Sequence, residues 1–450
     1  MIDLTRGRPM KVIFLYTIPL LLGNFFQQFY SFIDTLIVGK TISVNALASV
    51  GATGGLTGLI IGFAQGMTSG LTILTAQKHG AHDEQGVRQS FASGIIISFW
   101  ITIIFTLLAL ALAYPLLVVM QTPKVLIRDS FIFLEIIFEG IFSFVGFDFL
   151  GNTMRALGDS RVPLFFLIIS TVLNILLELV FILYLRMGVA GAGLATVVAQ
   201  TITFIILYFY IRHHIPYLIL TRKDFKIDKA EIKELLHISL PMGFQSSIIA
   251  IGSIILQVML NTLGANAVAA YTVAGRVEQI ATLPAFSFGL ALVNYTAQNL
   301  GAKKFQRILR GVRDGIIISV SSSLVIGGLL IVFGRAISHL FMNGSQNAVL
   351  NLVQIYYYFN GSTYFILSIL FIVRYTLQGL GNQKAPTIAG IAELLMRVFA
   401  GIVLVHFFGF YGAAMANPLA WSGSVLVLVS TWNIQIKKLK NMSNLLGENV

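Results

Sequence analysis

The chain has 450 residues, of which 56% are apolar and 11% are charged, whereas a soluble domain carries roughly 25% charged residues. It contains no cysteine, which excludes disulfides, thiol catalysis and cysteine lipidation. The formal charge of +12 would suit nucleic acid, but the apolar runs and the placement of the basic residues indicate a membrane protein, so we expect no nucleic-acid partner.

Twelve apolar runs follow one another along the chain, and each is long enough to cross the roughly 30 Å hydrocarbon core of a bilayer as a helix. Because a helix satisfies its own backbone groups in lipid, we predict an all-α polytopic membrane protein with twelve transmembrane helices. The predicted spans are about residues 12–38, 46–76, 91–119, 130–154, 162–185, 189–211, 237–263, 268–298, 314–340, 347–375, 385–408 and 411–434.

Asp34 lies within the apolar run of the first span, where an ionisable group is costly. Polar residues recur at helical spacing on the same side, which favours a helix face turned towards protein or water. We expect Asp34 to bind an ion, with a bond to a neighbouring helix as the simpler alternative. The polar residues of this stripe are Asn24, Gln27, Gln28, Ser31 and Thr35.

Glu178 is the second acid in an apolar run, in the middle of the fifth span. Asn174 lies one turn before it on the same face. Thr196, in the sixth span, comes close if the two helices pack antiparallel. Such a carboxylate, amide and hydroxyl can hold a proton, a hydronium or a sodium ion through oxygen atoms. A satisfied polar cluster between helices is the alternative.

The second half of the chain repeats the first at an offset of 221 to 223 residues, as when residues 155–159 (RALGD) return as 378–382 (QGLGN). With six spans in each copy, both copies enter the membrane in the same sense, so we expect two six-helix bundles related by a pseudo-two-fold axis along the membrane normal. The expected parts are an N-lobe (1–211), a cytoplasmic amphipathic linker (212–236) with a short helix after Asp228, and a C-lobe (237–450) with a short basic tail.

The acids of the first copy do not recur in the second, which has its own set. Glu393 and Arg397 are four residues apart, as in an intrahelical ion pair. Arg276 and Glu278 are two apart and do not face each other, so each needs a partner elsewhere. The C-lobe ion-pair candidates are therefore Arg276, Glu393 and Arg397, and the candidates for a substrate cavity are Asn24, Gln28, Ser31, Gln257, Glu278 and Tyr364.

The basic residues are distributed unevenly between the two sides of the predicted membrane. If the N-terminus is cytoplasmic, 23 of the 30 Lys and Arg lie in cytoplasmic segments and 5 in outer ones, with Arg276 and Arg397 inside spans. The positive-inside rule then places both termini in the cytoplasm. We expect a multi-pass protein of the cytoplasmic (plasma) membrane, a monomer with the bilayer around it.

Several motifs, in this order and spacing, resemble the MATE (multidrug and toxic compound extrusion) transporters over about residues 8–435: Pro19, residues 32–39 (FIDTLIVG), 155–159 and 297–302 (AQNLGA). The resemblance implies export of organic, often cationic, compounds in exchange for H+ or Na+, with two six-helix lobes that alternate between outward-open and inward-open forms. It also implies that Pro19 lets the first helix bend.

The N-lobe ion site resembles that of the DinF-like branch of the family. That site uses an Asp in the first helix, an Asn and an Asp one turn apart in the fifth helix, and a Thr in the sixth helix. The matching residues are Asp34, Asn174, Glu178 and Thr196, with Glu in place of the second Asp. The NorM-like branch adds acids in the seventh and tenth helices, but residues 237–263 and 347–375 contain none, so we do not expect that C-lobe site.

The function expected from these features is secondary active multidrug efflux by antiport with H+ or Na+. The alternative is a flippase for lipid-linked or polysaccharide precursors, which would need a strongly cationic cavity. We find no phosphate loop, no metal-ligand spacing and no nucleophile elbow, so we expect neither an enzyme nor a metal or cofactor beyond the coupling ion.

Overall fold

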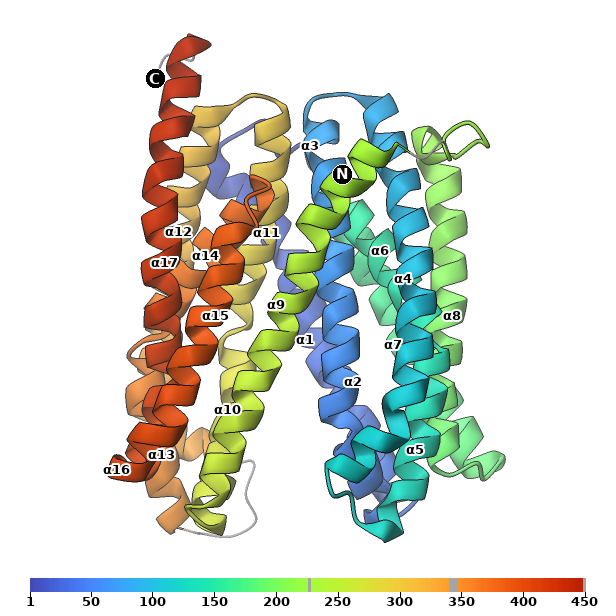
Figure 1. The fold of residues 1–450 in the computed structure, drawn as a ribbon, viewed down its shortest axis with the longest axis vertical. Helices are drawn as coiled ribbons and strands as arrows, with labels where there is room; N and C mark the ends of the chain where they lie inside the picture. Colours follow the sequence, from blue (N-terminus) through green and yellow to red (C-terminus); the bar gives the residue numbers. More distant parts are fainter. Residues whose placement is uncertain (226–227, 340–346, 448–450) are drawn as a thin grey trace. The chain divides into compact units, whose positions relative to one another are not determined.

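The computed structural model describes residues 1–225, 228–339 and 347–447, and Figure 1 shows their helices. No strand occurs within these ranges. In the described residues, nine helices are each long and apolar enough to cross a bilayer, and three further spans are pairs of helices bent by 43°, 47° and 47°. The predicted all-α fold with twelve spans is therefore confirmed, with three of the spans bent.

The chain forms two compact units, and their helices follow the order of the sequence. The first unit contains residues 22–247 and the second contains residues 2–21 and 248–450. Two helices are divided between them, α1 (Pro9–Thr41) and α9 (Lys229–Asn261). The division therefore passes through these two helices and not, as in the expected lobes, at the linker.

The remaining helices each belong to one unit. Those of the first unit are α2 (Val44–Leu71), α3 (Ile73–Gly80), α4 (Glu84–Val119), α5 (Lys124–Glu139), α6 (Ile141–Ala156), α7 (Arg161–Leu179), η1 (Val180–Tyr184), α8 (Val189–His214) and η2 (Pro216–Leu218). Those of the second unit are α10 (Ala265–Ala281), α11 (Leu283–Gly301), α12 (Phe305–His339), α13 (Asn347–Gly361), α14 (Tyr364–Gly379), α15 (Lys384–Phe399), η3 (Ala400–Leu404), α16 (Val405–Phe408) and α17 (Phe410–Leu445).

The repeat in the sequence is also a repeat in the backbone. Gly158 and Gly381 both have positive φ, at 86° and 78°, in the turns that follow α6 and α14. Glycine adopts this conformation without the steric cost that a Cβ would add. The π-helical turns η1 and η3 follow α7 and α15 at matching places. Each copy therefore builds its fifth span in the same irregular way.

The predicted linker helix is not a separate element. Asp228 does cap a helix start, because its Oδ1 accepts a hydrogen bond from the backbone N–H of Ala230 at 2.8 Å. The helix that starts there continues without a break as α9. Its residue Leu235 is buried in the core of the first unit and does not lie on a membrane surface. Residues 226–227 of the predicted linker lie outside the described residues. The predicted C-terminal tail is mostly helix, because α17 continues to Leu445.

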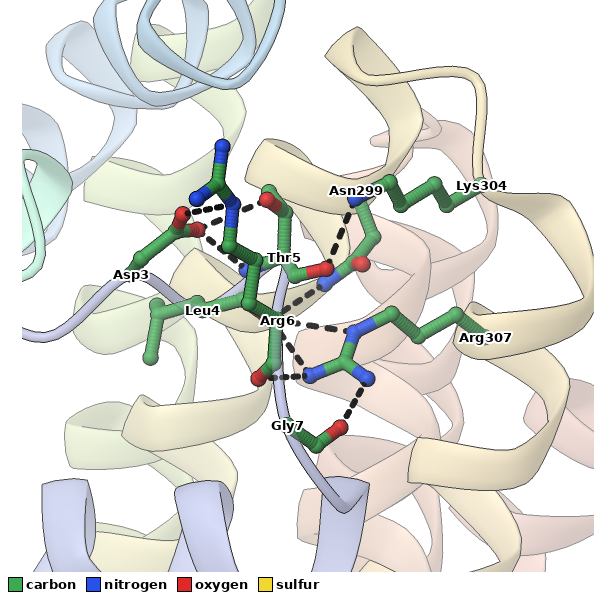
Figure 2. A network of polar contacts seen from close by, with 8 residues as sticks. All are labelled: Asp3, Leu4, Thr5, Arg6, Gly7, Asn299, Lys304 and Arg307. Carbon is green, nitrogen blue, oxygen red and sulfur yellow. Dashed lines mark hydrogen bonds and ion pairs between the residues drawn. The ribbon is translucent and has the colours of Figure 1, made fainter.

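The N-terminal segment before α1 is tied to the second unit by hydrogen bonds to its backbone carbonyls (Figure 2). Arg307 donates to the carbonyl oxygens of Leu4, at 3.1 and 3.2 Å, of Arg6, at 2.7 Å, and of Gly7. Lys304 Nζ donates to Thr5 O at 2.9 Å, and Asn299 Nδ2 donates to Leu4 O at 3.1 Å. These bonds, together with the packing of Ile13, Tyr16 and Leu20 in the core of the second unit, join residues 2–21 to that unit.

Candidate functional site

The residues predicted to form the ion site all lie in the first unit. Asp34 is on the second half of α1, Asn174 and Glu178 are on α7, and Thr196 is on α8. Helices α7 and α8 pack against each other. Asn174 and Glu178 are one turn apart and face the interior of the unit, with exposed fractions of 2% and 0%.

Thr196 holds three of the neighbouring groups in place. Asn174 Nδ2 donates a hydrogen bond to Thr196 Oγ1 at 3.2 Å, and that hydroxyl donates to the carbonyl oxygen of Ala192 at 3.1 Å. The hydroxyl oxygen of Tyr30 lies 3.3 Å from Thr196 Oγ1. Because Thr196 uses its proton on Ala192, the Tyr30 hydroxyl donates to it. Tyr30 is one turn before Asp34, a spacing that could have identified it from the sequence.

Three oxygen atoms at this site are buried with no hydrogen-bond donor among the described residues except a neighbouring carboxyl. Oδ1 of Asn174 has no hydrogen-bond partner among the described residues, and the carboxyl oxygens of Glu178 have none except the neighbouring carboxyl of Asp34, with which they can share a proton. The carboxyl of Asp34 is partly buried and interacts electrostatically with that of Glu178. Buried acceptors normally have partners, and two neighbouring carboxylates in a membrane interior repel each other. A proton or a hard monovalent cation satisfies both requirements.

Pro19 lies inside α1, fifteen residues before Asp34 and in the part of the helix that belongs to the second unit. Proline lacks the N–H that would bond to the residue four positions earlier, so it weakens the helix locally. The weak point is three residues before Leu22, where α1 passes into the first unit.

The substrate-cavity candidates are divided between the two units. In the first unit, Asn24 and Gln28 are partly buried and Ser31 is exposed. In the second, Gln257 Nε2 donates to Asn261 Oδ1 at 3.0 Å. Tyr364 is 2% exposed, its hydroxyl has no hydrogen-bond partner among the described residues, and its ring lies 6.0 Å from that of Trp421.

Glu278 belongs to a polar cluster of the second unit that joins α10, α13 and α17. The hydroxyl of Tyr356 donates a hydrogen bond to Glu278 Oε2. Asn417 Nδ2 donates to Glu278 Oε1 at 3.3 Å and to the Tyr356 hydroxyl oxygen at 3.1 Å. Both carboxyl oxygens therefore accept hydrogen bonds. No sequence pattern points to Asn417, which lies 139 residues from Glu278.

Glu393 bridges two buried arginines in the same unit. Its Oε1 lies 3.1 Å from Arg397 Nη2, the predicted pair, and its Oε2 lies 2.8 Å from Nη2 of Arg374. Arg374 also donates to Ser424 Oγ at 2.9 Å. Arg374 lies at the end of the predicted span 347–375, where its sequence position groups it with the cytoplasmic bases, but the structure buries it. Arg276 is exposed and forms no ion pair within the described residues, so it takes no part in this network.

Comparison with known proteins agrees with this architecture. The MatE family model matches residues 19–180 and 241–403, one match in each copy of the repeat. The chain is 29% identical to the "Probable multidrug resistance protein YoeA" of Bacillus subtilis, over 94% of this chain and 93% of the relative.

A second relative and a solved structure extend the comparison. The chain is 23% identical to the "Probable multidrug resistance protein NorM" of Thermotoga maritima, over 88% of this chain and 86% of the relative. The structure titled "Outward-facing conformation of a multidrug resistance MATE family transporter of the MOP superfamily" has a TM-score of 0.90 and 22% identity, over 98% of both chains, which shows the shared fold. The family model covers more than half of this sequence, and the chain therefore belongs to the MatE family.

Proposed function

We propose that the chain is a secondary active multidrug exporter that exchanges organic, often cationic, compounds for H+ or Na+. Two relatives named as probable multidrug resistance proteins support the part of the proposal that concerns several drugs. The observation that carries the coupling is the group of buried oxygen atoms on Asn174 and Glu178 that have no hydrogen-bond partner among the described residues except the carboxyl of Asp34.

The coupling ion acts on the charge of this site. A proton or Na+ bound between Asp34 and Glu178 removes the repulsion between the carboxylates and supplies a partner for their oxygen atoms. A ligand shifts a conformational equilibrium only by its differential affinity for the two states. The ion therefore drives export if it binds more tightly in the state that releases substrate outward.

Helix α1 is the part of the chain best suited to transmit this change. Its Asp34 end packs in the first unit, and its Pro19 end is held in the second. Bending at Pro19 then accompanies loading or release of the ion at Asp34. In this proposal the protein works as a monomer of the cytoplasmic membrane, with both termini in the cytoplasm and no cofactor except the coupling ion.

The test is exchange in proteoliposomes loaded with a fluorescent organic cation. Asp34→Asn keeps the size of the side chain but removes its charge, so it should insert normally and lose ion-driven exchange. Asp129→Asn, at a partly buried position outside this site, serves as a matched control and should keep it. Imposing a pH jump with and without Na+ separates the two coupling ions. Full exchange by Asp34→Asn would sink the proposal.

A flippase for lipid-linked precursors is the second candidate function. One observation favours it, since Arg374 and Arg397 share a single carboxylate and so leave one excess positive charge buried in the second unit. An anionic pyrophosphate head group would be attracted by that charge. Competition of a short-chain polyprenyl pyrophosphate with the fluorescent cation distinguishes the two functions, because an exporter of organic cations should be insensitive to it.

A further inference from the structure

An open groove of about 300 Å³ lies on the second unit between α12 and α17. The two helices pack side by side in Figure 1. From α12 the groove is lined by residues between 309 and 317 at spacings of three and four, which form one helix face. From α17 it is lined by Trp432, Ile436 and Lys440, again on one face. The groove therefore extends along about 12 Å of each helix.

The lining of the groove is apolar except for two bases. The part of the groove that lies further from the C-terminal end of α17 is lined by Ile316, Ile317 and Trp432. The only charged residues of the lining are Arg313 and Lys440. Both bases are exposed. Neither makes a hydrogen bond or an ion pair within the described part of the chain. The groove thus combines an apolar wall with two cationic groups that have no counter-charge.

The surface that adjoins the groove faces the hydrocarbon of the bilayer. Along α12, large apolar side chains remain exposed at Ile317, Leu324, Val325 and Val332, with exposed fractions of 44%, 56%, 63% and 69%. Their spacing of seven or eight residues keeps them on one face of the helix. In a membrane span such a face contacts lipid. A molecule that enters the groove from this side comes from the bilayer, where phospholipids are the most abundant molecules.

We propose that the groove binds one anionic phospholipid. The phosphate lies between Arg313 and Lys440, and an acyl chain packs along Ile316, Ile317 and Trp432. Guanidinium and ammonium groups make charge-assisted hydrogen bonds to phosphate. Long basic side chains on a membrane helix extend along apolar surface towards the head-group level. Basic pockets between transmembrane helices on the cytoplasmic side bind anionic head groups in this way.

The test measures lipid binding to the purified full-length protein. Native mass spectrometry counts bound phosphatidylglycerol against phosphatidylcholine, and the apparent Tm is followed as each lipid is added. A contact of about 1 kcal/mol between the phosphate and each base in the groove gives about a five-fold preference, so Arg313→Gln with Lys440→Gln should lower the affinity for phosphatidylglycerol about 30-fold. Because both side chains are exposed, this variant should fold normally.

The matched control is Arg310→Gln with Lys437→Gln, which removes the same charge from exposed positions of the same helices but outside the groove. This variant should keep its preference for phosphatidylglycerol. An equal loss in both double variants, or no preference in the wild type, would overturn the proposal.

Two further experiments distinguish the contribution of the head group to binding from that of the acyl chain. Ile316→Ser leaves the charge unchanged and should still weaken phosphatidylglycerol binding several-fold, because the acyl chain loses apolar contact. Soluble glycerol 3-phosphate at millimolar concentration should not displace the lipid. Displacement by that compound would show a site for free phosphate esters and would refute the assignment to a membrane lipid.

Discussion

Replacing Glu393 with Gln should destabilise the second unit strongly. The carboxylate lies 2.8 Å from Arg374 and 3.1 Å from Arg397, and the three side chains are between 5% and 8% exposed. At an effective dielectric constant of about 20, each contact corresponds to about 5–6 kcal/mol of attraction. Most of it offsets desolvation, but removal of the shared partner leaves two buried guanidinium groups without a counter-charge, which costs about 3–5 kcal/mol.

The assay is thermal unfolding of the purified protein in detergent, in which Glu393→Gln should lower the apparent Tm by roughly 5–15 °C. The exposed Arg276→Gln should change stability by less than about 0.5 kcal/mol. A triple variant with Arg374→Met, Glu393→Leu and Arg397→Met should recover most of the loss, because it removes all three buried charges together. The reasoning is refuted if Glu393→Gln unfolds at the wild-type temperature or if the triple variant is less stable than the single one.

Two further predictions concern the N-terminal segment and the first helix. Burial raises the pKa of Asp3, but hydrogen bonds from Thr5 and the charges of Arg6 and Lys304 outweigh it and hold that pKa below the usual 3.8. Asp3 should therefore stabilise the N-terminal segment above about pH 3.8 and lose this effect as the pH falls through its lowered pKa. Amide hydrogen exchange of residues 2–8 should then become faster as the pH falls through that range, beyond the intrinsic pH dependence of exchange. An Asp3→Asn variant with the same pH dependence would contradict this. Tyr30→Phe should lower the apparent affinity for the coupling ion about 2–10-fold, because Thr196 loses one hydrogen bond. Exposed Tyr358→Phe should not change it, and an unchanged half-saturating ion concentration for Tyr30→Phe would count against the site.

The transmembrane helices could be predicted from the sequence because lipid leaves the backbone few alternatives. The same constraint made Asp34 and Glu178 stand out, since an acid in an apolar run is rare. The spacing of Asn174 and Glu178 then placed both on one buried face of α7. The contact of Asn174 with Thr196 followed from helical periodicity and one assumption about the packing of α7 against α8.

Other features depend on contacts between distant parts of the chain, which no local pattern reports. Arg374 looked like a cytoplasmic base because its buried partner, Glu393, lies in the next span. Asn417 looked like an ordinary polar residue until the fold brought it to Glu278. The break between α13 and α14 was also missed, because apolar residues continue on both sides of it and the bend of 47° leaves the hydropathy unchanged.

The division of α1 and α9 between the two units constrains the order of folding during synthesis. The first unit cannot be completed until residues up to 247 have been made, although its other helices end at residue 218. Residues 2–8 must wait still longer, because the Arg307 that holds them is synthesised about 300 residues later. The earliest part of the chain is therefore among the last to reach its final contacts. Halves of the protein expressed separately would each lack a segment that the other supplies.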